Sequence, residues 1–333
     1  MLFRSNYKIN QFDAKFNWHT DKLMLSGAYY GSWFNNVNGS MTQTFNGLLY
    51  NPNGSTLNPA VVGGNNLAGP FAMGNPVALQ PDNQSHQISV AGNYAFSPTT
   101  RSTFKFSSTR GTQNEDFSSM GLGAGVLPRA NLGAVIMTNV GQIGITSRPW
   151  QKLSLLANLR YEQKADKTPI EVYTLAGNTN GRSSHTKISG KVEASYQLPG
   201  AFRATVGGDV DYRDLGVPLP TNDTSGQASA LRQKTQEMGF RAELRRSMSE
   251  TLNGAVSFAH SSRNGSTWMN ATTKQTQGDT SFPGVFNLFP LMMTDLTRDR
   301  LKWSADWAAT DQLSMQFFVD ASREHYLAPS VRG

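Results

Sequence analysis

The sequence predicts an all-β fold: an antiparallel up-and-down transmembrane β-barrel, with about twelve strands present as part of a larger barrel. Three observations lead to this prediction. Apolar and polar residues alternate along many segments, tight turns alternate with long polar connections, and the alternating segments are long enough to cross a bilayer at a tilt.

The alternation is clearest on both sides of the turn Ser97-Pro98-Thr99-Thr100. Small and polar residues such as Ser89 and Lys105 occupy one phase. The other phase, which includes Gly92, holds the large apolar residues Ile88, Val90, Tyr94, Phe96, Phe104 and Phe106. A period of two is typical of a strand whose two faces meet different surroundings.

The same pattern recurs along the chain in six pairs of segments, each pair flanking a tight turn. The predicted turns are centred near residues 20, 98, 149, 200, 249 and 311. The connections between pairs are longer and rich in Asn, Gly, Pro, Ser and Thr: 35–84, 114–132, 165–184, 214–234 and 264–296. Short turns at one end and long loops at the other are typical of an outer-membrane barrel. A soluble β-sandwich or β-helix is the alternative, with shorter strands and less strictly sorted connections.

Segment length and aromatic placement fit a membrane. Leu23–Trp33 and Phe202–Tyr212 each span ten residue steps, which is about 33 Å along a strand. At a tilt of about 45° this rises roughly 23 Å, close to the ~25 Å apolar band of such barrels. Aromatic residues that suit the headgroup layers lie at both ends of the segments: Trp18, Phe96, Trp150, Tyr196 and Phe202 near the tight turns, and Trp33, Tyr161 and Tyr212 at the far ends.

The two phases therefore predict a lipid-facing and a lumen-facing set of side chains. The lipid-facing set includes Phe104, Leu155, Val206, Phe240 and Trp303. The lumen-facing set includes Lys105, Asn158, Asp209, Arg241 and Asp306.

Composition agrees with this assignment. Charged residues make up 16% of the 333 residues, the mean hydropathy is −0.43, and no run of eighteen apolar residues predicts a transmembrane helix. The net charge of +7 would admit nucleic acid, but no run of five Lys or Arg exists and both signs are mixed, so we expect no nucleic-acid partner. We expect one outer-membrane barrel domain over residues 1–333, incomplete at both ends.

No constellation of residues predicts catalysis, so we expect a protein that is not an enzyme. The chain has no cysteine, which excludes disulfides, iron–sulfur ligation and covalent haem attachment within it. The five histidines are isolated in sequence, and His86 and His260 fall in the apolar phase near predicted strand ends, where an interfacial role is expected. A Ser-His-Asp hydrolase has no G-x-S-x-G stretch to support it.

The candidate functional residues are charged side chains in the lumen phase: Lys105, Lys191, Glu193, Arg203, Asp209, Asp211, Arg241, Glu243 and Arg245. One interpretation is a structural ladder, in which each cross-strand pair contributes about 0.2–1 kcal/mol. The other is a surface complementary to something inside the lumen. The ladder alone is favoured, and the two interpretations are compatible.

The amino-acid sequences of the hairpins resemble those of a known family. The stretches PDNQSHQISVAGNYAFSPTTRSTFKFSSTRGTQNEDF (81–117) and GITSRPWQKLSLLANLRYEQKADKTP (144–169) are similar to repeated hairpins of the MtrB/PioB family of decahaem-associated outer-membrane proteins. The likeness is strongest over 81–214 and continues to the end. Some members carry a Cys-x-x-Cys near the N-terminus, and nothing here matches it.

The resemblance implies a location and a function. Family barrels lie in the outer membrane of Gram-negative bacteria and sheathe a periplasmic multihaem c-type cytochrome, which forms an electron conduit for extracellular electron transfer. The implied partners are that cytochrome and outer-membrane lipid. The chain itself is expected to bind no cofactor, because the haem c groups belong to the cytochrome. The alternative is a general diffusion porin with a water-filled lumen.

Overall fold

The structure is a computed structural model that describes residues 6–42, 76–120, 127–173, 180–216, 230–270 and 291–327. Its main element is one twelve-stranded antiparallel sheet in which sequential strands are neighbours. The strands are β1 (Tyr7–His19), β2 (Leu23–Asn36), β5 (Asn83–Ser97), β6 (Thr100–Gln113), β7 (Ala134–Trp150), β8 (Leu153–Asp166), β9 (His185–Gln197), β10 (Phe202–Leu215), β12 (Lys234–Ser247), β13 (Leu252–Gly265), β15 (Asp295–Thr310) and β16 (Leu313–Leu327).

Short elements lie in the long connections at one end of this sheet. Two small antiparallel pairs, β3 (Ser40–Thr42) with β4 (Pro76–Ala78) and β11 (Ala230–Leu231) with β14 (Met269–Asn270), were not predicted from the sequence. A 3₁₀ turn, η1 (Leu291–Met293), precedes β15. No helix in the described part of the chain is long and apolar enough to span a membrane.

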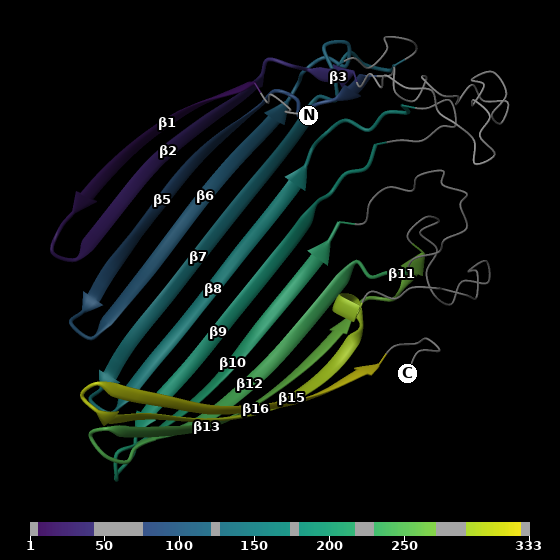
Figure 1. Cartoon of the computed structure of the whole chain (residues 1–333). Coiled ribbons are helices and arrows are strands. Elements are labelled where there is room, and N and C mark those ends of the chain that lie inside the picture. The colour runs from purple at the N-terminus through teal and green to yellow at the C-terminus, as the bar shows by residue number, and fades with distance from the viewer. Residues whose placement is uncertain are drawn as a thin grey trace.

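The hairpin prediction is confirmed. All six predicted pairs form, and the tight turns gather at one end of the sheet while the long connections gather at the other (Figure 1). The third turn lies at residues 151–152, two residues beyond the predicted centre, because β7 continues past a bulge to Trp150. The strands are also longer than predicted; for example, β10 extends three residues beyond Tyr212.

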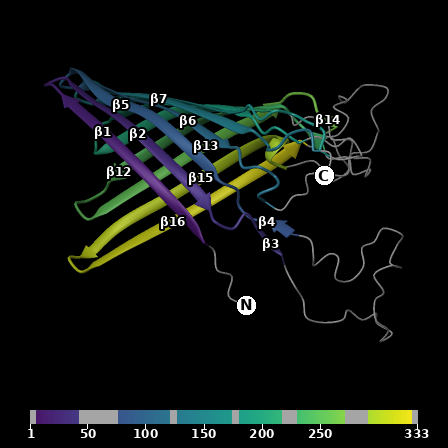
Figure 2. The same cartoon turned by 90° about the horizontal axis from the view of Figure 1, so that it is seen from above.

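The sheet is strongly curved but not closed (Figure 2). The strands β1 and β16 are its two edges and do not pair with each other. Edge strands leave a row of backbone N–H and C=O groups without ladder partners, which a closed barrel avoids.

The register separates two faces through the whole sheet. Directly paired residues share a face, and the pairs Phe104–Ile143, Ile143–Leu159, Leu159–Gly190 and Gly190–Val210 carry one apolar face across five strands. The same face continues over the remaining strands, because Gly208 pairs with Phe240 and Val256 pairs with Trp303. All five predicted lipid-facing residues lie on this face, and all five predicted lumen-facing residues lie on the opposite one.

The polar face is the inner side of the curved sheet. Side chains on this face reach each other over an intervening strand, as Glu193 of β9 and Arg241 of β12 do across β10. Such pairs form where side chains converge, which is the concave side. The outer face, by contrast, leaves large apolar side chains open, with Val206 57% and Phe240 51% exposed. An exposed apolar surface of this extent agrees with the predicted lipid-facing side.

Candidate functional site on the inner wall

From β2 to β16 the inner face consists of two regions with different side chains, and the edge strand β1 adds Asp13 and Lys15 to this face. We call the inner face of β2, β5, β6 and β7 the neutral wall, because between Leu23 and Ser147 only Arg101 and Lys105 carry charge there. We call the inner face of β8 to β16 the charged wall. Eight of the nine predicted site residues lie together on β9, β10 and β12 of the charged wall, whereas Lys105 lies apart on β6.

One cluster of the charged wall lies near its loop end. The Lys187 ammonium is 3.1 Å from Asp211 Oδ2, and Arg213 Nε donates to Asp211 Oδ1 at 2.6 Å. These residues come from β9 and β10, which the register places side by side. The carboxylate of Asp211 is therefore held between two cations, one of them on the neighbouring strand.

A second cluster lies nearer the middle of the strands. Glu193 pairs with Lys191 of its own strand, at 2.8 Å between Nζ and Oε2, and with Arg241 on β12. The bridge to Arg241 passes over Gly207 of β10, which is the direct register partner of both Glu193 and Arg241. A Cβ at position 207 would lie 2.9 Å from the Glu193 side chain. Glycine therefore leaves the space that this two-strand ion bridge needs.

A third cluster joins β12 to β16. Arg263 pairs with Glu237 at 2.9 Å, and Arg298 Nε donates to Glu324 at 2.7 Å. Tyr326 donates its hydroxyl hydrogen to the same Glu324 at 2.6 Å. Two further pairs extend the cluster toward the turns: Arg300 and Lys302 with Asp320, and Arg245 with Asp306.

Besides Lys105 on β6, three predicted site residues have no ion pair within the described parts of the chain: Arg203, Asp209 and Glu243. They lie on β10 and β12, among the paired clusters. Because most neighbouring charges are already matched inside the wall, these three are the charges most open to an external partner.

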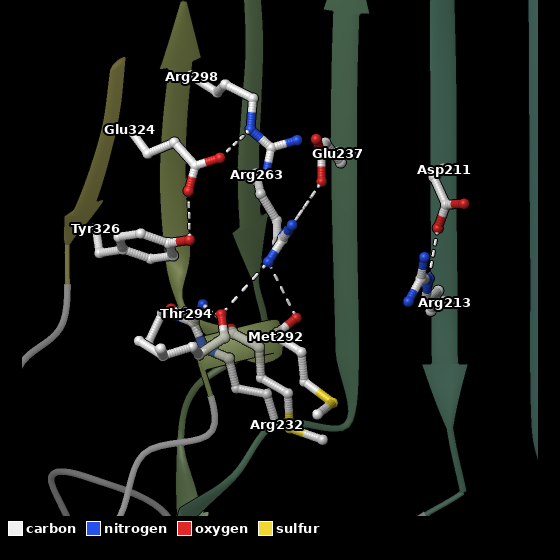
Figure 3. A network of polar contacts seen from close by, with 12 residues as sticks. Asp211, Arg213, Arg232, Glu237, Arg263, Met292, Thr294, Arg298, Glu324 and Tyr326 are labelled. Atoms are coloured by element: carbon white, nitrogen blue, oxygen red, sulfur yellow. Dashed lines mark hydrogen bonds and ion pairs between the residues drawn. The ribbon is translucent and has the colours of Figure 1, made fainter. Parts of the chain in front are cut away.

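The 3₁₀ turn η1 lies at the loop end of the charged wall, and two arginines bond to its carbonyl groups (Figure 3). Arg263 donates to the carbonyl oxygens of Leu291 at 3.4 Å and of Met292 at 3.1 Å. Arg232 donates to the Met293 carbonyl at 3.2 Å and pairs with Asp295 through both terminal nitrogens.

The side chains around this anchor are the most deeply buried of the described residues. The Arg232 guanidinium stacks 4.6 Å from the centre of the Trp268 ring. Thr294 is fully buried and Leu296 is 1% exposed. We call Arg232, Arg263, Trp268, Asp295 and η1 the mouth anchor, because together they fix the start of β15 at the loop end of the sheet.

Sequence reasoning missed much of this network. Arg298, Arg300 and Lys302 stand at alternate positions in the lumen phase of β15, so the period-two pattern was sufficient to find them. Arg232 lies outside the twelve long strands, so no alternation could have pointed to it. Among the described residues, no group of three or more His, Asp or Glu side chains is close enough to hold a metal ion.

The sequence comparison decides the family. A family model described as "Putative outer membrane beta-barrel porin, MtrB/PioB" matches residues 3–331. The chain belongs to the MtrB/PioB family. It is therefore an outer-membrane β-barrel protein of the porin type, located in the outer membrane of a Gram-negative bacterium. No curated protein sequence matches this MtrB/PioB chain.

Several solved outer-membrane structures are similar to the chain. The ferric-catecholate import receptor Fiu of E. coli K12 has 11% identity and a TM-score of 0.47, over 94% of this chain and 51% of that receptor. The FrpB iron transporter of Neisseria meningitidis has 9% identity and a TM-score of 0.43, over 96% of this chain and 53% of the transporter. This chain thus spans about half the length of these structures.

Proposed function

We propose that this barrel sheathes a multihaem c-type cytochrome and so forms part of an electron conduit across the outer membrane. Membership of the MtrB/PioB family supports the proposal, together with the charged wall. The observation that carries it is the mixed-sign surface of β9, β10 and β12, where paired clusters surround the unpaired Arg203, Asp209 and Glu243. Charge patterns of this kind set the register and specificity of a protein partner.

In this proposal the barrel does no redox chemistry itself. It excludes lipid through its outer face and positions the cytochrome through its inner face. The chain has no cysteine for covalent haem attachment, so the haem c groups belong to the cytochrome. The barrel is therefore not an enzyme and binds no cofactor of its own.

A porin with a water-filled lumen is the second candidate. The neutral wall favours it, because Ser, Thr, Asn and Gln side chains there suit contact with water: Ser89, Asn93, Thr103, Thr109 and Gln142 are examples. The two candidates differ in what the full-length protein carries when purified from its native host. A sheath carries a haem-containing partner, and a porin carries none.

The test is co-purification of a haem-staining protein with the full-length barrel. Reversal of Lys191, Arg203, Arg241 and Arg245 to Glu should weaken this co-purification, while assembly is largely spared because lumen substitutions do not face lipid. Arg203→Glu alone is the cleaner variant, because Arg203 has no ion pair in the described wall to lose. Lys22→Glu, in the β1–β2 turn, makes the same change in net charge away from the wall.

The expected result is weaker cytochrome co-purification with Arg203→Glu and unchanged co-purification with Lys22→Glu. A wild-type preparation that is free of haem and has high single-channel conductance would instead establish the porin. In that case the charge reversals should change ion selectivity.

A further inference from the structure

The outer face carries few charged side chains within the described strands, and most of them have a partner. Asp214 and Lys234 are 3.9 Å apart, and His260 bonds to Asp299 at 2.7 Å. Arg246 lies over the Phe202 ring near the tight turns. Arg110, like Lys8 and Arg323, is exposed and forms no ion pair in the described residues. It is flanked across the strands by His86 and Met137 rather than by a carboxylate.

Arg110 lies at the height of the outer headgroup layer. It is ten residues beyond Thr100, where β6 leaves the tight turn. Ten steps rise roughly 23 Å at the usual strand tilt, so Arg110 is at the loop end of the apolar band. Because long loops are extracellular in such barrels, the adjoining leaflet is the outer one.

The neighbours of Arg110 form a built site rather than a lone cation. The Tyr29 hydroxyl is 2.8 Å from His86 Nδ1, and the Trp33 ring meets the His86 ring edge-on at 5.3 Å between centroids. Gly31 is the direct register partner of His86, and a Cβ there would lie 2.7 Å from the Trp33 ring and 3.1 Å from the Tyr29 hydroxyl. Glycine thus lets both aromatic rings converge beside His86.

In this arrangement His86 and Arg110 keep hydrogen-bond donors that suit an anionic ligand. When Tyr29 donates to Nδ1 of His86, the other ring nitrogen carries the hydrogen and can itself donate. The guanidinium of Arg110 offers several donors in a planar fork, which matches phosphate oxygens. Tyr and Trp rings lie at the boundary between headgroups and acyl chains.

The closest carboxylates toward the loops are already engaged. Asp82, four residues from His86, accepts hydrogen bonds from the Asn35 side-chain amide and from the Asn36 backbone N–H. Glu115, five residues from Arg110, accepts from the backbone of Asp82 and from Ser119. Neither carboxylate forms an ion pair with Arg110 in the described chain.

We propose that Arg110 and His86, framed by Tyr29 and Trp33, bind the phosphate of a phosphorylated lipid in the outer leaflet. The site is on the outer face and does not depend on what fills the lumen. It would fix one point of the wall at the membrane surface, with the aromatic rings packed against the lipid below its phosphate.

The test uses the full-length protein in detergent micelles and native mass spectrometry with lipid A as the probe. Replacing Arg110 by Gln removes the charge-assisted hydrogen bonds, so lipid A binding should weaken roughly tenfold. Arg110→Lys should retain part of the affinity as a point charge. Lipid A with its phosphates removed should bind the wild type and Arg110→Gln equally.

Two matched variants control for net charge. Arg323 lies at the same height on the outer face of β16, but directly opposite Asp299, and Lys105 lies on the inner face. Arg323→Gln and Lys105→Gln should bind lipid A as the wild type does. The shift in mobility on heating, measured by gel electrophoresis, checks that each variant is folded.

Three results would overturn the proposal. Arg110→Gln could bind lipid A as tightly as the wild type. Arg323→Gln could lose as much affinity as Arg110→Gln, which would indicate attraction by overall charge. Inorganic phosphate in excess could displace lipid A fully, which would indicate a site for a free anion instead of a lipid.

Discussion

The neutral wall and the charged wall share the alternating strand pattern but differ in their inner-face side chains. Both have large apolar residues on the outer face, for example Val90 on β5 and Val206 on β10. Their inner faces differ: β5 shows Ser, Asn, Gln and Ala, whereas β9 and β10 show Lys, Glu, Arg and Asp. Contact with lipid requires apolar side chains on the outer face of every strand. The lumen sets no such requirement for the inner face. The proposed partner surface is therefore the inner face of β8 to β16.

The largest expected effect tests the part that the two walls share. Val90→Arg and Val206→Arg each place a charge in the apolar band, and each should lower the free energy of unfolding by about 2–4 kcal/mol. Urea titration of the full-length protein in micelles measures this loss. Thr205→Arg, on the inner face beside Val206, is the control and should cost much less. Unequal losses at Val90 and Val206 would show that the outer face is not uniform.

The mouth anchor belongs to the charged wall alone, and its loss should be the next largest effect. Arg232→Ala removes the partner of Asp295 and the cation that stacks on Trp268. A buried pair that loses one partner costs 3–5 kcal/mol, but Asp295 is partly exposed, so we expect about 2 kcal/mol. Hydrogen exchange of the Thr294 and Leu296 amides should speed up accordingly. Arg213→Ala, at a more exposed pair, is the control and should leave these amides unchanged.

The ion bridge over Gly207 should have a smaller effect. Arg241→Gln leaves Glu193 with only Lys191, so we expect a loss of about 1 kcal/mol, discounted for the solvent-accessible lumen. The double variant Glu193→Gln with Arg241→Gln should cost less than the sum of the two single variants. Strict additivity of the three unfolding free energies would mean that the two side chains do not interact.

The smallest effect is expected in the neutral wall. Lys105 has no ion pair in the described residues, so Lys105→Gln should change the free energy of unfolding by no more than about 0.5 kcal/mol. The same urea titration measures it. A loss as large as that of Arg241→Gln would remove the distinction between the two walls.

Much of the fold followed from the sequence. The alternation predicted the six hairpins and both sets of facing residues, because a strand between lipid and a polar lumen must place apolar side chains at every second position. The candidate residues of the charged wall followed in the same way, since each is simply in the opposite phase. The partner inside the lumen stays a prediction, because the pattern requires only that these side chains avoid lipid.

Some elements lay outside the reach of this pattern. The pairs β3–β4 and β11–β14 are two or three residues long, too short to show a period. Arg232 is in a connection, so its role depends on where the chain returns in space. Its contacts with Asp295 and Met293 join residues more than sixty positions apart.

The sequence by itself determined which face of each strand meets lipid, since that choice depends on the residue's own phase and on nothing distant. The tertiary structure alone decided which charged side chains form ion pairs with each other. Glu193 and Arg241 become partners because the register aligns both with Gly207 and the curvature brings their side chains together over it. In the same way, Gly31 opposite His86 decided where two aromatic rings converge. Ion pairs and binding sites depend on distances of a few ångströms across strands, and only register and curvature set those distances.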